Sequence, residues 1–256
     1  MIYSQVWGTG AQDALMLHCA LASSDAWRGV AGRLGDRLTM TGFDFRSHGK
    51  STDWDGLGDY HSVCSTDAKA FLKRPMHLIG HSFGATVALR LAQEHPEMLR
   101  SLTLIEPVFF AVAKGTAAYE THMSGFQPFL DAMAHGTQED AARLFTAAWG
   151  TGADWEALPP AMRRYMQDRI GLIPATIPAL YEDNAAMAAA GRLEAVACPV
   201  LLLEGANSPD IVSAINTGLA ARLPDVQRRK VEGASHMLPI THSGDVARAI
   251  GGFLDA

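Results

Sequence analysis

The sequence predicts an α/β fold, in which a mostly parallel sheet is covered by helices on both faces. Strand-like apolar runs alternate with helix-like runs along most of the chain, the pattern typical of parallel sheets. The alternation stops once, between about residues 110 and 195, where only helix-like stretches occur. An apolar strand at 75–81 also passes through a tight glycine turn directly into a helix. With 256 residues and 48% hydrophobic side chains, the chain is long enough to bury one sizeable core.

Each element follows from its local pattern. Short apolar runs bounded by turn residues predict strands at 2–7, 14–18, 38–44, 75–81, 101–106, 199–204 and 227–232. Apolar residues at helical spacing predict helices at 25–37, 59–73, 83–94, 211–222 and 243–255. Because these elements alternate, we expect helices on both faces of one sheet.

A helical insertion divides the predicted core into residues 1–108 and 196–256, with the insertion at 109–195. Its helices are predicted at 115–134, 138–149, 159–171 and 177–191. An independent second domain is the alternative. We favour a lid over the carboxyl edge of the sheet, where ligands bind in such folds, because both junctions are expected at strand ends beside Ser82.

Ser82 is the predicted nucleophile. It stands at the apex of Gly80-His81-Ser82-Phe83-Gly84, between the strand 75–81 and the helix 83–94. Such a turn lifts a serine Oγ clear of the sheet, and the two glycines remove side chains where strand and helix approach closely. The helix also points its free N–H groups at the place where an oxyanion would form.

A serine needs a base, and His236 is the predicted one. It follows the last predicted strand and precedes the last helix, so its loop lies at the same sheet edge. The orienting acid is less clearly marked. Ser208 occupies the expected position after the strand 199–204, and Asp210 lies two residues later. Glu106 ends the strand after the nucleophile helix, where burial calls for a cationic partner. We favour Glu106, with Asp210 as the alternative acid.

An oxyanion hole needs two N–H donors. We expect one from Phe83, directly after the nucleophile, and one from the loop 18–24. Ala20 is the favoured donor of that loop, and Leu21 is the alternative.

These motifs together resemble the α/β-hydrolase superfamily over nearly the whole chain. His18-Cys19-Ala20 is similar to its His-Gly-X turn, with cysteine in place of glycine. The segment 44–51 is similar to its Asp-x-Arg-Gly-His-Gly-x-Ser loop, with serine for one glycine. The elbow at 80–84 is intact, and Gly233-Ala234-Ser235-His236 matches the terminal Gly-x-x-His element. Some branches, including certain haloalkane dehalogenases, place the acid one strand earlier, which is the position of Glu106.

The resemblance implies a serine hydrolase that forms an acyl-enzyme at Ser82 and needs no cofactor. The insertion carries many aromatic and methionine residues, which favour an apolar pocket for an uncharged ester, thioester or lactone. These residues are Phe109, Phe110, Tyr119, Met123, Phe126, Phe129, Met133, Phe145, Trp149, Trp155, Met162, Tyr165 and Met166. The candidates for contact with substrate are Arg46, His48, His81, Phe109, Phe110 and Met237.

Three alternatives stay open. Arg46 and His48 are suited to a substrate carboxylate, as in carbon–carbon bond hydrolases of the superfamily. An enol lactonase or a cofactor-free perhydrolase would use the same serine machinery. A ligand-binding protein that has lost turnover is the third alternative, since the position of the acid is unsettled.

Composition narrows the partners and the location. The formal net charge is −6 and no basic cluster stands out, which argues against nucleic acid and anionic membranes. The histidines and three cysteines show no metal-ligand spacing, so no metal is expected. The amino terminus lacks the charged and apolar regions of a signal peptide. We therefore expect a cytoplasmic monomer or homodimer that acts on a small molecule.

Overall fold

The computed structural model describes residues 1–255 and is built around a seven-stranded sheet with the order β1-β3-β2-β4-β5-β6-β7. The strands are β1 (Ser4–Trp7), β2 (Gln12–Leu17), β3 (Leu38–Phe43), β4 (Met76–His81), β5 (Leu99–Ile105), β6 (Val200–Gly205) and β7 (Val226–Val231). β1 runs antiparallel to β3, and all other neighbours are parallel. The predicted fold class is therefore confirmed.

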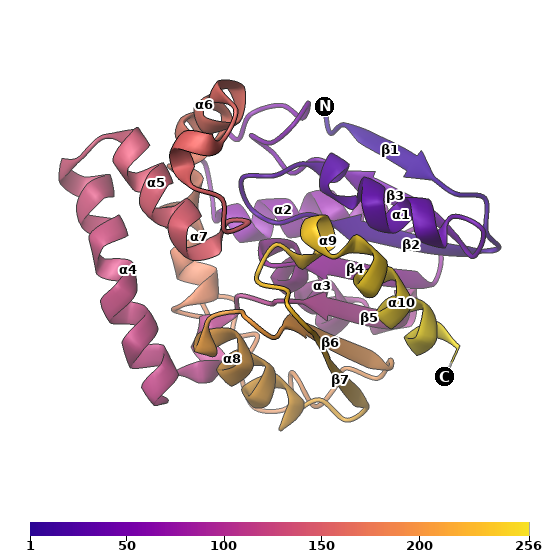
Figure 1. Ribbon diagram of the computed structural model, residues 1–256. Helices are drawn as coiled ribbons and strands as arrows, with labels where there is room; N and C mark the ends of the chain where they lie inside the picture. Colours follow the sequence, from indigo (N-terminus) through magenta and orange to yellow (C-terminus); the bar gives the residue numbers. More distant parts are fainter. Residues whose placement is uncertain (256) are drawn as a thin grey trace.

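Alternate side chains of the strands sort onto two faces, each covered by its own helices (Figure 1). On one face, residues such as Met16 and Ile79 pack against α1 (Arg28–Leu34), α9 (Leu238–Thr241) and α10 (Ser243–Leu254). On the other, residues such as Leu17 and Leu78 pack against α2 (Tyr60–Lys69), α3 (Phe83–Glu94) and α8 (Asp210–Ala220). Central β4 is buried along its whole length, so its carboxyl end lies inside the molecule.

The segment between β5 and β6 contains α4 (Ala117–His135), α5 (Gln138–Trp149), α6 (Pro160–Arg169) and α7 (Leu172–Leu180). Within the described residues, no strand falls in this segment, and Figure 1 shows its helices beside one edge of the sheet. Tyr165 on α6 ties the segment to the core, because its hydroxyl donates to the Ala22 carbonyl at 2.8 Å and accepts from the Gly49 amide at 2.9 Å. We keep the name helical insertion for residues 109–195.

One argument for the lid was wrong. The insertion does leave from the carboxyl end of β5, next to the turn that holds Ser82. It returns, however, to the amino end of β6, where the Leu102 amide donates to the Pro199 carbonyl at 2.9 Å. Parallel neighbouring strands require this, because the chain must cross the length of the sheet before it enters the next strand.

The predicted helix at 177–191 is also displaced. α7 begins at Leu172 and ends at Leu180, and the residues that follow form turns. The Asp183 carboxylate accepts hydrogen bonds from the amides of Met187 and Ala188, at 2.7 and 2.9 Å. Its φ of 53° is left-handed. A side chain that bonds the local backbone in this way competes with helix formation and overrides the helix propensity of the alanines.

The helices described over residues 1–255 include none that is both long enough and apolar enough to cross a bilayer.

Candidate active site

The turn between β4 and α3 presents Ser82 in the strained conformation expected of a nucleophile elbow. Ser82 has φ 54° and ψ −118°, and its amide donates to the Ile105 carbonyl on β5 at 2.9 Å. The flanking glycines permit this turn. A Cβ on Gly80 would lie 2.4 Å from the Gly84 carbonyl oxygen, and one on Gly84 would lie 2.3 Å from that of Leu17. Strand and helix therefore meet backbone to backbone.

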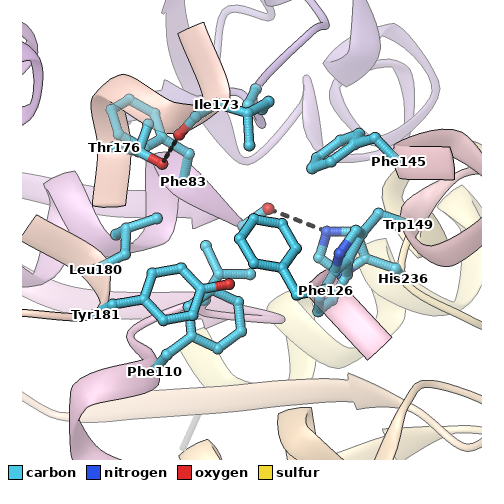
Figure 2. A pocket seen from close by; sticks show the side chains of 13 residues that line it. Phe83, Phe110, Phe126, Phe145, Trp149, Ile173, Thr176, Leu180, Tyr181 and His236 are labelled. Atoms are coloured by element: carbon cyan, nitrogen blue, oxygen red, sulfur yellow. Dashed lines mark hydrogen bonds between the residues drawn. The ribbon is translucent and has the colours of Figure 1, made fainter. Parts of the chain in front are cut away.

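His236 lies in the loop between β7 and α9, and its imidazole reaches the serine. His236 Nε2 is 3.0 Å from Ser82 Oγ, the contact that Figure 2 draws as a dashed line. The backbone of this loop is fixed from the elbow itself, because His81 Nε2–H donates to the His236 carbonyl at 2.8 Å. Both side chains are buried, with His236 only 4% exposed.

Glu106 directly follows β5 and completes a chain of three side chains. Its Oε2 is 3.1 Å from His236 Nδ1, and the carboxylate is 0% exposed. An ionised carboxylate only accepts hydrogen bonds, so Nδ1 carries the imidazole proton and Nε2 is free to accept from the Ser82 hydroxyl. This is the tautomer that a general base needs. Glu106 has φ 50°, and this left-handed backbone turns its side chain back toward the loop of His236.

Of the two candidate acids, the structure brings Glu106 to His236 and leaves Asp210 away from it. Asp210 is the first residue of α8 and is exposed. Ser208, at the position where an acid was expected, donates its hydroxyl to Glu106 Oε1 at 2.7 Å. The Gly205 amide donates to the same oxygen at 2.6 Å. Glu106 thus uses one oxygen for His236 and the other for two donors, one from the last residue of β6 and one from the loop that follows.

The two residues expected to supply the oxyanion hole lie at the cavity beside the serine. Ala20 and Phe83 both line the cavity next to Ser82. As the first residue of α3, Phe83 has no intrahelical partner for its N–H. The amide of Leu21, in contrast, donates to His48 Nε2 at 3.0 Å. The alternative in which Leu21 replaces Ala20 as oxyanion donor therefore does not fit this arrangement.

Three buried histidines support the loops of the site from behind. His48 accepts from Leu21 through Nε2 and contacts the Arg46 carbonyl through Nδ1 at 3.0 Å. His18 accepts from the Phe45 amide through Nε2, also at 3.0 Å. Burial lowers the pKa of His18 to about 4 and, with the neighbouring His18, that of His48 to about 3. Burial and the adjacent His236 also hold the pKa of His81 well below its usual range. The three imidazole rings are therefore neutral near pH 7 and hold the loops in place through hydrogen bonds.

A cavity that contains Ser82, and that we call the main cavity, opens between the core and the helical insertion; the space between its walls, open solvent included, is about 430 Å³. Aromatic and aliphatic side chains form most of its wall (Figure 2). It is lined by Ala20, Ser82, Phe83, Val108, Phe110, Phe126, Phe145, Trp149, Ile173, Thr176, Leu180, Tyr181 and His236. Trp149 stands edge-on to His236, with ring centroids 4.7 Å apart. Among these described lining residues there is no lysine, arginine, aspartate or glutamate.

The predicted substrate contacts divide into those at a cavity and those away from one. Phe110 lines the main cavity, and Met237 lines a second cavity that shares Ala20, Phe145 and Trp149 with it. Phe109 is fully buried in the core cluster and does not line the main cavity. Arg46 pairs with Asp67 at 2.7 Å outside the cavity, and His48 and His81 are taken up by the bonds above. These four side chains therefore line neither of the two cavities, unlike the expectation for residues that contact substrate.

Sequence reasoning missed two groups of site residues. Ile173, Thr176, Leu180 and Tyr181 line the main cavity from α7 and its end, a segment whose helix was predicted out of register. The second is Ser208, which the sequence marks only as the position of an absent acid. Its hydroxyl could have been expected to matter, because a hydroxyl there supplies a hydrogen-bond donor to the carboxylate that acts as the catalytic acid in its place.

Residues 1–255 contain no group of three or more histidine, cysteine, aspartate or glutamate side chains that is suited to a metal ion.

Comparisons with known proteins agree with the architecture. The chain is 29% identical over 254 residues to pimeloyl-[acyl-carrier protein] methyl ester esterase of Methylococcus capsulatus, which covers 94% of each chain. It is 28% identical over 240 residues to N-formylmaleamate deformylase of Pseudomonas putida, covering 90% of this chain and 83% of that protein. The solved enol-lactonase of Burkholderia xenovorans superposes with a TM-score of 0.72 at 16% identity, covering 100% of this chain and 96% of that one.

The expectation of an ester-hydrolysing enzyme is supported by these relatives. The sequence model described as "Alpha/beta hydrolase family" matches residues 14–249, nearly the whole chain. The chain belongs to the alpha/beta hydrolase family.

Proposed function

We propose that the protein is a serine hydrolase that cleaves a small-to-medium, largely apolar ester through an acyl-enzyme at Ser82. The observation that carries the proposal is the continuous chain of contacts Ser82–His236–Glu106, at 3.0 and 3.1 Å, on the floor of an apolar cavity. A serine, a base within hydrogen-bond reach and a buried acid behind the base are the parts that nucleophilic acyl transfer requires.

In the proposed first step, Ser82 Oγ attacks the ester carbonyl carbon while its proton moves to His236 Nε2. The negative charge that develops on the carbonyl oxygen is stabilised by the amides of Ala20 and Phe83, and the positive charge on the imidazole by Glu106. Collapse of the tetrahedral intermediate breaks the bond to the alcohol oxygen, which takes the proton from Nε2. A water molecule then repeats the sequence on the acyl-enzyme and releases the acid.

The composition of the cavity wall favours a substrate with an uncharged acyl group. Its residues are mainly aromatic or aliphatic, so they would desolvate a charged substrate without offering it a partner. Arg46 does not provide one, because its guanidinium is held by Asp67 at 2.7 and 3.1 Å. This placement weakens the case for a carbon–carbon bond hydrolase that binds a substrate carboxylate. It also separates this chain from relatives named for the carboxylates N-formylmaleamate and 2-(acetamidomethylene)succinate.

The test is hydrolysis of p-nitrophenyl esters of increasing acyl length by the wild type and by Ser82→Ala. We expect turnover by the wild type, an optimum at short to medium chains, and a loss of about 10⁴-fold or more in Ser82→Ala. A fluorophosphonate should label the wild type at Ser82 and leave Ser82→Ala unlabelled. Hydrolysis that survives in Ser82→Ala, or a wild type that neither turns over esters nor takes the label, would overturn the proposal.

A further inference from the structure

Tyr181 brings a hydroxyl group into a cavity whose wall on that side is otherwise apolar except for Thr176. It follows the last residue of α7, is 8% exposed, and directs its hydroxyl toward the centre of the main cavity (Figure 2). The hydroxyl lies 2.8 Å from Nε2 of His122 on α4. Phe110 stacks on both rings, with centroids 4.3 Å from Tyr181 and 4.5 Å from His122. Three segments of the insertion therefore fix one phenol group.

The other polar side chain on this wall already donates its hydroxyl proton within the protein. Thr176 lines the cavity, but its hydroxyl donates to the Ile173 carbonyl at 2.8 Å within α7. The neighbouring Leu180 and Ile173 are apolar. A substrate atom on this side that needs a hydrogen bond therefore meets Tyr181.

The position of Tyr181 assigns it to the acyl arm of the ester. His236 must pass its proton to the alcohol oxygen, so the alcohol arm lies on the side of His236 and Trp149. Figure 2 shows Tyr181 and Leu180 on the opposite side of the cavity from these two rings. The acyl arm extends toward them once the carbonyl oxygen faces the amides of Ala20 and Phe83.

We propose that Tyr181, held in place by His122, is a specificity-determining residue that selects esters whose acyl chain carries one uncharged oxygen, as a hydroxyl, ether or ketone group. The inference rests on the proposed ester hydrolysis at Ser82. An acyl oxygen that leaves water for this cavity keeps a hydrogen bond to the phenol, whereas a plain alkyl chain leaves the phenol with His122 as its sole partner.

Both members of the pair are neutral near pH 7. Burial lowers the pKa of His122 to about 4, and burial raises the pKa of Tyr181 above its usual range. A neutral imidazole has one N–H group and one acceptor nitrogen. Depending on which tautomer is present, Tyr181 donates to a substrate ether or ketone, or accepts from a substrate hydroxyl. The Tyr181–His122 pair therefore offers no positive charge to a substrate carboxylate.

The experiment compares matched ester pairs. One member is p-nitrophenyl hexanoate, and the others carry one uncharged oxygen at successive chain positions, as an ether in place of a methylene in one series and as a hydroxyl on it in the other. The ratio of kcat/KM for the oxygen-bearing over the alkyl ester is measured in the wild type, Tyr181→Phe, His122→Phe and Tyr119→Phe. Comparing variants on the same esters cancels the electronic effect of the added oxygen. Tyr119, a partly exposed tyrosine of α4 outside the cavity lining, is the matched control.

At one chain position we expect Tyr181→Phe to lower the ratio about five- to tenfold, mainly through KM, while turnover of the alkyl ester stays within about twofold. His122→Phe should lower the ratio less, since the phenol remains but loses its orienting partner. Tyr119→Phe should leave it unchanged. A ratio that Tyr181→Phe does not change at any position would overturn the proposal and make the pair purely structural.

A binding experiment separates this inference from the proposed function. The ethyl esters of the same acids are titrated into Ser82→Ala and into the double variant with Tyr181→Phe, with tryptophan fluorescence, to which Trp149 in the cavity wall contributes, as the signal. The Kd of the oxygen-bearing ester relative to that of the alkyl ester should rise in the double variant by about the factor by which the kcat/KM ratio falls. Absent turnover in the wild type, together with this rise in the Kd ratio, would overturn ester hydrolysis alone. An unchanged Kd ratio would overturn the role of Tyr181.

Discussion

The two walls of the main cavity hold their side chains in different ways. The core wall presents Ser82 and His236, with Glu106 buried behind them, and the structure gives each of these polar groups a hydrogen-bond partner. Two of the three residues have left-handed backbone, which only a well-determined surrounding structure maintains. The insertion wall is built from stacked aromatic rings and aliphatic side chains, with Tyr181–His122 as its one polar pair.

The two walls should therefore respond differently to mutation. Hydrogen bonds and close backbone contacts require accurate geometry, so a small change in the core wall should have a large effect on rate or stability. Apolar packing tolerates substitution of similar volume, so changes in the insertion wall should mainly shift the substrate preference.

The largest expected effect is that of Glu106→Gln. The glutamine oxygen would keep the donors Gly205 and Ser208, so its amide NH₂ would face His236 Nδ1 and favour the wrong tautomer. We expect kcat for a p-nitrophenyl ester to fall about 10³- to 10⁴-fold with little change in stability. Asp210→Asn is the control and should retain at least half of the activity. The reverse pattern in steady-state kinetics would assign the acid to Asp210.

A pair of glycine substitutions tests how closely the backbone of β2 and α3 packs beside Ser82, compared with an open position on α4. In Gly84→Ala the new Cβ would lie 2.3 Å from the Leu17 oxygen and 2.5 Å from that of His18, so strand and helix must separate. We expect the free energy of unfolding to fall by about 3 kcal/mol, together with loss of activity. In Gly125→Ala on α4 the Cβ meets open space, and the helix should gain about 0.5–1 kcal/mol. Urea denaturation measures both, and equal effects would refute the contrast.

Buried histidines of the core predict destabilisation by acid. Burial lowers the pKa of His18 and His61 to about 4 and, with His18 nearby, that of His48 to about 3, from an ordinary value of 6.5. Below pH 6.5 the unfolded chain binds protons that the folded chain does not, so stability falls as the pH falls toward 4. Each histidine contributes about 1.4 kcal/mol per pH unit.

Melting temperatures between pH 7.5 and pH 4 measure this loss. His61→Gln should make the decline shallower by about 2 kcal/mol at pH 4, because glutamine does not titrate there. A decline that begins only below pH 4.5, and that His61→Gln leaves unchanged, would attribute acid denaturation to carboxylates instead.

The smallest effect is expected for Ser208→Ala. The Glu106 carboxylate would lose the 2.7 Å bond from the Ser208 hydroxyl but keep the one from the Gly205 amide. We expect kcat to fall about tenfold with KM unchanged, which corresponds to one hydrogen bond to a charged acceptor. Asn207→Ala, at an exposed position next to it, is the control. Kinetics that do not distinguish the two variants would limit Ser208 to a structural role.

Local patterns were enough for most of the framework. Alternation of strands and helices predicted the parallel sheet, and the run from Met76 to Glu94 predicted the strand, turn and helix around Ser82 to within a residue. Such elements are encoded locally, by apolar periodicity and by the glycines that a tight turn needs. The end of the insertion was predicted less well, because the bonds of Asp183 outweigh the helix propensity of its alanine-rich neighbours.

By itself, the sequence determined the fold class and the two chemical groups, Ser82 and His236, whose motifs are continuous in the chain. Only the tertiary structure decided which acid faces His236, that Leu21 bonds His48, and that Tyr181 enters the cavity. Each of these depends on residues far apart in the chain, 130 positions apart for His236 and Glu106. Local propensity carries no information about such distances, which are set when strands pair and the insertion packs against the core.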